Sequence, residues 1–235
     1  EGALLGRRTA AQMAATRASL LEHAERLFGE NGYAQTQIAQ IAGAAGVGIG
    51  SFYRQFSDKE ALLMVLLGDL FEGLRCELVQ TRLHIEVRSP LEQLATIRKT
   101  YDAVFGVFID RPNVTRAMLM TGSGASVEVQ NFIWQAVDDL VVDMANDLAR
   151  AEAHGMLVMD DKKSFADALI GMCMQVTRRI LIEGSPTAEQ AAALCTRMTL
   201  GAMVPYLTSD VAEVLVPLIR SDRASNALPT LDTAR

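Results

Sequence analysis

Residues 36–60 of this 235-residue chain combine small, polar and basic side chains in a spacing that suits contact with DNA. Apolar residues recur there at helical intervals, and Gly46 stands where the chain must turn. Two short helices joined by such a turn form a helix-turn-helix, whose second helix enters the major groove with its amino-terminal residues at the base edges. In this chain those residues are Gly48, Ile49, Gly50 and Ser51.

These residue types favour close approach and apolar contact over hydrogen bonding. The two glycines let the backbone approach the bases, Ile49 offers a surface for a thymine methyl group, and Ser51 offers one hydroxyl. Thr36 or Gln37 is expected to cap the first helix of the motif and to bond a phosphate. The remaining specificity is expected from DNA shape and from Gln37, Arg54 and Gln55.

The segment IAGAAGVGIGSFYRQFSDKEAL resembles the DNA-binding domain of the tetracycline-repressor (TetR) family of bacterial transcriptional regulators, which typically reads I-A-x-A-A-G-V-S-x-G-T-x-Y-x-H-F-x-s-K-e-x-L. The resemblance extends back through Arg17 and LLEHAERLFGENGY, about the first quarter of the chain. It implies that Tyr53 contacts the DNA and that Lys59 holds a phosphate. A tyrosine that only packs the domain is the alternative for Tyr53. Gly48 departs from the family, which usually has a polar residue there, and Gln55 stands where histidine is common.

Charge is distributed unevenly along the chain. The net charge is −6, yet residues 1–60 contain six bases and six acids and are therefore neutral. Attraction to phosphate must then come from a few placed residues and from helix amino-termini, which predicts weak non-specific binding and a modest dependence on salt. Arg7 and Arg8 either reach a minor groove or form a solvated arm. The chain begins at Glu1 without a methionine, which leaves open whether native residues precede it.

Helix signals continue through the rest of the chain without a strand pattern. Ser57 and Glu60 predict a capping box that opens a long helix to about residue 86, and Ser89-Pro90 opens the next helix in the same way. That helix is expected to end near residues 111–112. Further helices are expected at residues 116–120, from 129 to Gly155, at 164–183 and from 186 to about 205, with Pro217 limiting any helix after residue 210.

The predicted fold is therefore all-α, with nine or ten helices. We predict a three-helix helix-turn-helix DNA-binding domain at residues 1–58 and a larger helical domain for effector binding and dimerisation at 59–222. The tail at 223–235 is expected to be disordered. The helices at 164–183 and 186–206 carry apolar and small residues suited to a four-helix dimer interface: Phe165, Ala168, Leu169, Met172, Val176, Ile180, Ala192, Cys195, Met198 and Met203.

The larger region also has material for a pocket that binds a small, mainly hydrophobic effector. Methionine and aromatic side chains recur on its helices, although ordinary helix core is the alternative for each of them. Arg98 lies on an apolar stripe, where a charge is costly unless it is paired. It either anchors an anionic effector or meets an internal carboxylate. The pocket candidates are Arg98, Tyr101, Phe105, Phe108, Met118, Met120, Phe132, Met144 and Met172.

Other kinds of site lack support in the sequence. Cys76, Cys173 and Cys195 suggest neither a disulfide framework nor a zinc site and are predicted to be small buried hydrophobes, with a thiol sensor as the alternative. No arrangement of nucleophile, histidine and acid suggests catalysis, and no motif indicates a cofactor. The acids at 138, 139, 143 and 147 are predicted to form a solvated face rather than a metal site. No apolar run is long enough to cross a membrane, so a cytoplasmic protein is expected.

Together these features predict a dimeric, ligand-responsive transcriptional regulator, specifically a repressor, that binds a palindromic operator in double-stranded DNA. The resemblance further implies that effector binding changes the separation of the two DNA-binding domains and releases the operator. One alternative is a helical enzyme, which the lack of catalytic residues disfavours. The others are a DNA-bound activator and a related protein whose DNA-binding domain no longer binds DNA.

Overall fold

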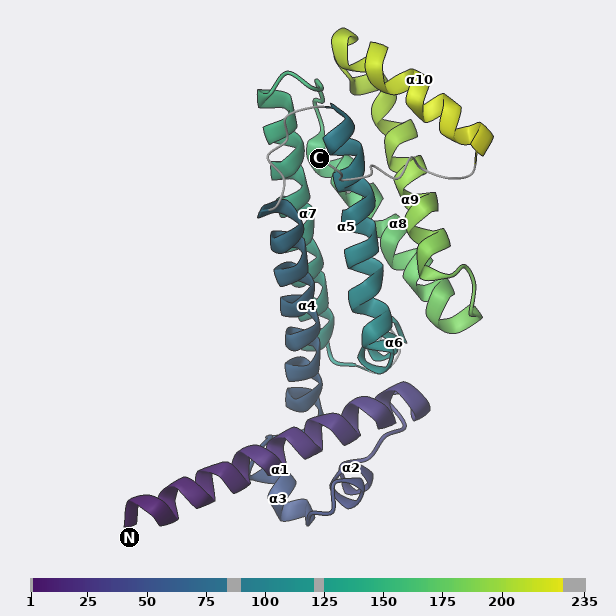
Figure 1. Cartoon of the computed structure of the whole chain (residues 1–235). Coiled ribbons are helices and arrows are strands. Elements are labelled where there is room, and N and C mark those ends of the chain that lie inside the picture. Colours follow the sequence, from purple (N-terminus) through teal and green to yellow (C-terminus); the bar gives the residue numbers. More distant parts are fainter. Residues whose placement is uncertain (1, 84–89, 121–124, 226–235) are drawn as a thin grey trace. The chain divides into compact units, whose positions relative to one another are not determined.

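The computed structural model describes residues 2–83, 90–120 and 125–225, and over these ranges the chain forms ten α-helices and no strand (Figure 1). This confirms the predicted all-α class. The chain divides into two compact units, of which the first comprises Glu1–Glu72 and Asp110–Gln135 and the second Gly73–Ile109 and Ala136–Arg235. None of the helices in the described ranges is both long and apolar enough to span a membrane.

Three helices open unit 1: α1 (Gly2–Asn31), α2 (Ile38–Ala44) and α3 (Ile49–Tyr53). Leu20, Ala24 and Phe28 recur one turn apart on α1 and are buried, so this face forms the core with residues of α2 and α3. The turn predicted at Gly46 is confirmed, since its φ of 68° lies in the left-handed region that favours glycine. Helix α1 begins well before the predicted first helix and includes Arg7 and Arg8, whose contact with DNA stays a prediction.

Helix α4 (Lys59–Leu83) begins at a different cap from the one predicted. The Asp58 carboxylate accepts a hydrogen bond from the Ala61 N–H at 2.7 Å, while the Ser57 hydroxyl donates to Asp58. This hydrogen bond holds the pKa of Asp58 below its ordinary value. Glu60 does not complete a capping box, because its carboxylate accepts from the Ser126 N–H at 3.0 Å. The predicted end near residue 86 lies outside the described residues.

Helix α6 (Pro112–Met120) packs closely on α1 within unit 1. Arg111, which precedes α6, pairs with Glu25 of α1 at 2.8 Å. A Cβ atom added to Gly29 would lie 2.3 Å from Oδ1 of Asn113, so only glycine allows this approach of the two helices. The predicted 116–120 helix is thus present and begins four residues earlier, at Pro112. The predicted loop at 121–124 lies outside the described residues.

Unit 2 contains most of the remaining helices: α5 (Pro90–Asp110), α7 (Val127–Ala153), α8 (Lys162–Glu183), α9 (Ala188–Met203), the 3₁₀ helix η2 (Val204–Tyr206) and α10 (Ser209–Ser225). Helices α4 and α7 have residues in both units. One core cluster joins α5, α8 and α9 through Tyr101, Phe105, Cys173, Ala191, Ala192 and Cys195. A second cluster joins the end of α7 to α9 and α10 through Leu148, Leu157, Met203 and Leu215.

The predicted helix ends in unit 2 are mostly correct. Gly155 and Gly184 follow α7 and α8 with φ values of 71° and 72°, as expected for glycines that end helices. Helix α9 starts slightly later than predicted, because Thr187 and Gln190 form a reciprocal capping pair. The predicted limit at Pro217 was wrong.

Helix α10 continues through Pro217, which is exposed, while buried Val211 and Leu215 anchor the helix. Proline removes one helical hydrogen bond, and burial of this apolar face offsets that loss. The helix extends to Ser225, so it includes the first three residues of the predicted tail. Residues 226–235 of that tail lie outside the described part of the chain. The predicted domain boundaries stay predictions.

Candidate nucleic-acid interface

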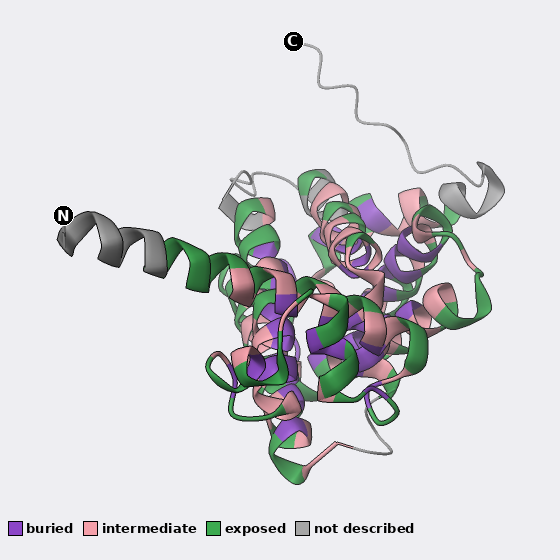
Figure 2. Ribbon diagram, turned by 90° about the horizontal axis from the view of Figure 1, so that it is seen from below, coloured by how far each residue is buried: buried purple, intermediate pink, exposed green. Residues whose placement is uncertain are grey.

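Helix α3 buries one side and exposes the other. Phe52 is fully buried, and its ring lies 5.8 Å from the ring of buried Phe56. Ile49 and Tyr53 are 49% and 56% exposed, and the Tyr53 ring meets the Phe52 ring edge-on at 5.6 Å between centres. Figure 2 colours the chain by burial. A five-residue helix that exposes both an isoleucine and a tyrosine presents apolar and aromatic surface to a partner.

Neither the backbone conformation nor the surrounding space in the described structure requires glycine at positions 48 and 50. Gly48 is the N-cap of α3 with a φ of −74°, and Gly50 is not among the glycines with positive φ. A Cβ atom at either position would meet nothing within 4 Å. Both glycines are exposed, so their small size is available for close approach of a molecule from outside the chain.

The polar residues around α3 fall into two groups. Arg54 is exposed, and its guanidinium donates to the Ser51 hydroxyl, so these two side chains act as one polar cluster. Gln37 is exposed at the N-cap of α2, and its N–H donates to Oε1 of Gln40 at 2.8 Å. The cap predicted at Thr36 or Gln37 is therefore confirmed at Gln37.

Thr36 has a different role from the predicted phosphate contact. Its side chain is buried, and its hydroxyl lies 2.9 Å from the Gly32 carbonyl oxygen and 3.2 Å from that of Leu27. The hydroxyl therefore ties the turn after α1 to the helix itself. We correct the prediction that this side chain reaches DNA.

The side chain of Lys59 also makes hydrogen bonds within the fold. Its ammonium nitrogen Nζ donates to the carbonyl oxygens of Tyr33 at 2.7 Å and Thr36 at 2.8 Å, with that of Ala34 at 3.5 Å. It also lies 4.3 Å from the centre of the Tyr33 ring. Two of the three donors of the ammonium group thus meet carbonyl oxygens within the fold, which gives Lys59 a structural role, and its predicted phosphate contact stays a prediction. Burial lowers the pKa of Lys59, an effect that Glu60 opposes.

Gln55 directs its side chain toward α1 instead of outward. Its Nε2 donates to the Met13 carbonyl oxygen at 3.3 Å, and its own carbonyl oxygen accepts from Arg17 at 3.2 Å. The predicted contribution of this amide to base reading stays a prediction. Sequence reasoning named Arg17 only as part of the family resemblance, because no local pattern shows that a residue of α1 meets the end of α3.

The candidate effector residues are divided between the two units. Met118, Met120 and Phe132 belong to unit 1, whereas Arg98, Tyr101, Phe105, Phe108, Met144 and Met172 belong to unit 2. Tyr101 and Phe105 fill the core between α5, α8 and α9, as the alternative of ordinary helix core anticipated. The Tyr101 hydroxyl bonds Thr199, and burial raises the pKa of Tyr101.

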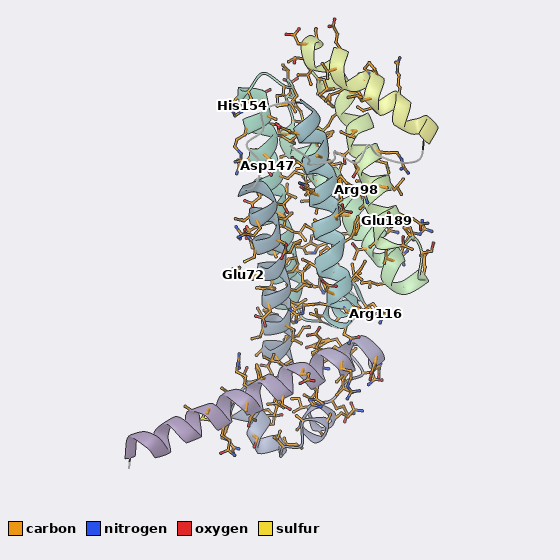
Figure 3. The ribbon with its side chains drawn as sticks, viewed as in Figure 1. Glu72, Arg98, Arg116, Asp147, His154 and Glu189 are labelled. Atoms are coloured by element: carbon orange, nitrogen blue, oxygen red, sulfur yellow. The ribbon has the colours of Figure 1, made fainter. Side chains whose placement is uncertain are left out.

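The side chain of Arg98 meets a carboxylate on its own helix. Its Nε lies 3.0 Å from both carboxylate oxygens of Asp102, one turn further along α5. Figure 3 labels Arg98 on this helix. This is the internal partner that the sequence left open as one of two possibilities. A role for Arg98 as an anchor for an anionic effector stays a prediction.

The acids and cysteines mostly follow their predicted structural roles. Asp139 and Asp143 lie 3.7 and 3.8 Å from Arg75, and Asp147 pairs with Arg150 on the same helix. Cys173 and Cys195 are buried, but Cys76 is exposed, so the prediction was wrong for that residue. Within the described ranges no group of three histidine, cysteine or acidic residues is placed to hold a metal ion.

Helices α8 and α9 bury within the subunit much of the face that was predicted to form the dimer interface. Leu169, Ala192, Cys195 and Met203 are buried within the chain. Of the predicted set Met198 is 52% exposed, and outside that set the same helices expose Ile182 at 46% and Leu194 at 38%. Small exposed residues lie beside this apolar face: Ala168, Gly171, Gly201 and Ala202. The stripe read from the sequence was therefore largely the core of the subunit.

Comparison with known sequences gives a family match in the region of α1 to α4. A sequence model described as bacterial regulatory proteins of the tetR family matches residues 20–65. The probable HTH-type transcriptional regulator ArpR of Pseudomonas putida is 36% identical over 107 residues, which are 44% of this chain and 47% of ArpR. The HTH-type regulator TtgR of P. putida strain DOT-T1E is 44% identical over 66 residues, 28% of this chain and 31% of TtgR. These matches span less than half of either relative.

Comparison with solved structures extends the likeness to most of the chain. The SmeT–triclosan complex has a TM-score of 0.66 at 24% identity, covering 84% of this chain and 94% of SmeT. Another SmeT structure, described as the repressor of the Stenotrophomonas maltophilia multidrug efflux pump SmeDEF, has a TM-score of 0.62 at 23% identity, covering 83% and 92%. The fatty acid degradation regulator FadR of Bacillus halodurans has a TM-score of 0.66 at 17% identity, covering 80% and 96%. At these identities the likeness establishes the fold.

Proposed function

Because this chain belongs to the tetR family of bacterial regulatory proteins, we propose that it is a repressor that binds double-stranded operator DNA through α3. The observation that carries the proposal is the exposed side of α3. Ile49 and Tyr53 project from a helix whose only buried side chain is Phe52, and the exposed glycines at 48 and 50 have no packing role. A major groove requires such a narrow, protruding surface.

The contacts of this surface differ in kind. Ile49 meets a thymine methyl group, the backbone at Gly48 and Gly50 approaches the base edges, and the cluster of Ser51 and Arg54 supplies hydrogen-bond donors. Tyr53 contacts the DNA backbone, and Gln37 meets a phosphate at the amino-terminus of α2. With a neutral amino-terminal region, binding to non-specific DNA is weak.

The functional molecule in this proposal is a homodimer. Two subunits join through the exposed apolar face of α8 and α9 that includes Ile182, Leu194 and Met198. Small residues beside these side chains allow the helices of two subunits to approach closely, as in a four-helix interface about a two-fold axis. Such a dimer reads a palindromic operator, one half-site for each subunit. Since the chromosome lies in the cytoplasm, the protein acts there.

A small, mainly apolar effector controls the DNA affinity in this proposal. The structural neighbour SmeT is described in complex with triclosan, which gives a first probe for this chain. By linkage, the factor by which the effector lowers the affinity for the operator equals the factor by which the operator lowers the affinity for the effector. Thermal unfolding in the presence of triclosan tests its binding, and a titration of the protein–DNA complex tests release.

The proposal is tested by selecting duplexes from a random-sequence pool with the purified chain. We expect enrichment of one inverted-repeat sequence that the protein binds more tightly than a scrambled duplex. Repeated rounds with no enriched sequence, at low salt and with folded protein, would contradict DNA recognition.

A further inference from the structure

We infer that Arg17 of α1 is a positioning residue for DNA reading, which holds the carboxyl end of α3 in place without contacting DNA. The inference rests on the proposed function, because it gives Arg17 a part in how α3 recognises its operator. It goes beyond that function by assigning operator specificity to a residue outside the helix-turn-helix itself.

Helix α3 is too short to hold its own orientation. It contains five residues, and helices shorter than about 12 residues are marginal in water. At its carboxyl end the Gln55 and Phe56 N–H groups both bond the Phe52 carbonyl oxygen, at 2.8 and 2.9 Å. Within α3 only Phe52 is buried. The direction in which Ile49 and Tyr53 project therefore depends on contacts from other helices.

Arg17 makes two contacts with the segment that follows α3. Its Nη1 donates to the Gln55 carbonyl oxygen at 3.2 Å, and its Cζ lies 4.3 Å from the centre of the Phe56 ring. The Phe56 side chain is only 4% exposed, so the guanidinium stacks on a ring that the core already fixes. Among the described residues no carboxylate pairs with Arg17, whose guanidinium contacts are with this segment.

A second link joins the same two regions. Nε2 of Gln55 donates to the carbonyl oxygen of Met13, which lies one helical turn before Arg17 on α1. Gln55 thus receives a hydrogen bond from α1 on its main chain and returns one from its side chain. A rotation of α3 about its own axis would break both bonds, so α1 fixes the angle at which the exposed face meets a groove.

A positioning residue and a phosphate contact differ in measurable ways. A phosphate contact strengthens binding to every sequence and adds to the dependence of affinity on salt. A residue that only orients α3 strengthens binding to the operator, because base contacts alone need the correct angle. Thermal stability alone does not separate these roles, but the ratio of specific to non-specific affinity does.

The experiment uses the full chain, a duplex that the parent protein selects from a random pool, and a scrambled duplex. The variants are Arg17→Met, Arg17→Lys and, as a control, Arg26→Met, which removes another α1 cation whose side chain is 48% exposed. We expect Arg17→Met to weaken binding to the selected duplex about tenfold, with little change for scrambled DNA and an unchanged salt slope. Arg17→Lys keeps a cation over Phe56 and should recover part of the loss, and Arg26→Met should match the parent.

A double-mutant cycle keeps the test independent of folding defects. Phe56→Leu keeps an apolar but smaller side chain and removes the ring beneath Arg17, so the double mutant should lose less specificity than the sum of the losses of the two single mutants. Equal losses on both duplexes with a salt slope shallower by about one unit per subunit would instead make Arg17 a phosphate contact and overturn the inference. Unchanged specificity in the folded Arg17 variants would also overturn it. If the parent selects no sequence, the proposed function itself fails.

Discussion

The ammonium nitrogen of Lys59 lies 2.7 Å from the carbonyl oxygen of Tyr33 and 4.3 Å from the centre of that residue's ring. The first residue of α4 thereby fastens the turn that links α1 to α2. Burial, together with Glu60 and Asp58, raises the pKa of Tyr33 to about 12, which keeps its hydroxyl neutral at physiological pH. This lysine therefore contributes to the packing of the amino-terminal helices.

Replacing Lys59 should therefore cost stability more than DNA affinity. In Lys59→Met the carbonyl oxygens of Tyr33 and Thr36 lose the hydrogen bonds from the ammonium group, and we expect a loss of about 1–3 kcal/mol in the free energy of unfolding. The salt slope of operator binding should stay that of the parent. Urea unfolding and salt titrations check the two effects, with exposed Lys163→Met as the control. A shallower slope with unchanged stability would restore the phosphate contact.

The cap of α4 predicts a specific dependence of stability on pH. Because the folded pKa of Asp58 lies below its ordinary value of 3.8, the unfolded state takes up the proton first as the pH falls. The stabilisation is complete above about pH 4 and is lost as the pH falls through the folded pKa. Asp58→Asn keeps an oxygen cap that does not titrate, so its stability should fall less between about pH 5 and pH 3 than that of the parent. If the urea midpoints of Asp58→Asn and of the parent fall by the same amount over this pH range, Asp58 is not the titrating cap of α4.

Gly50 should show opposite effects on stability and on binding. Alanine fits the space at this position, so Gly50→Ala should raise the free energy of unfolding by about 0.5 kcal/mol. Its methyl group would obstruct the approach of α3 to the bases, so operator affinity should fall about tenfold. Gly43→Ala in α2 is the matched control, since that glycine is also exposed and open, and it should gain stability without losing affinity. If Gly50→Ala binds the operator as tightly as the parent, the backbone at Gly50 does not approach the bases closely.

The dimer interface is tested by placing a charge on the exposed face of α9. Met198 is 52% exposed, and in a dimer through this face Met198→Glu would bury an unpaired carboxylate in apolar surroundings. Light scattering at micromolar concentration should report a dimer for the parent and a monomer for the variant. Val158→Glu alters a side chain that is 64% exposed elsewhere, and it should remain dimeric. If Met198→Glu stays dimeric, the subunits join through another surface.

Most of the fold could be predicted because its signals are local. Gly46, Gly155 and Gly184 follow helix ends at the expected places. The four-residue spacing of Phe52 and Phe56 identifies the buried residues of α3 and of the segment after it. The α4 cap was misplaced by one residue because Ser57 and Asp58 are both good caps, and only the structure shows which oxygen meets the Ala61 N–H.

The roles of individual site residues were harder to predict, since they depend on contacts distant in the sequence. Lys59 bonds a carbonyl oxygen 26 residues away, and the Arg17 bond to Gln55 spans 38 residues. A sequence shows that a lysine carries a charge, but it does not show which hydrogen-bond acceptors surround the ammonium group. Tyr101 shows the same dependence on distant contacts, because its hydroxyl bonds Thr199, 98 residues further on, within the core of unit 2.

The most direct measurement of the central claim is the affinity of Tyr53→Ala for the duplex that the parent selects. Tyr53 is 56% exposed on α3, so its removal should leave helix content and dimerisation unchanged while weakening binding about tenfold or more. Trp134→Ala, which removes another exposed aromatic side chain at 61%, should bind like the parent. If the folded Tyr53→Ala dimer binds this duplex as tightly as the parent, α3 is not the surface that reads DNA.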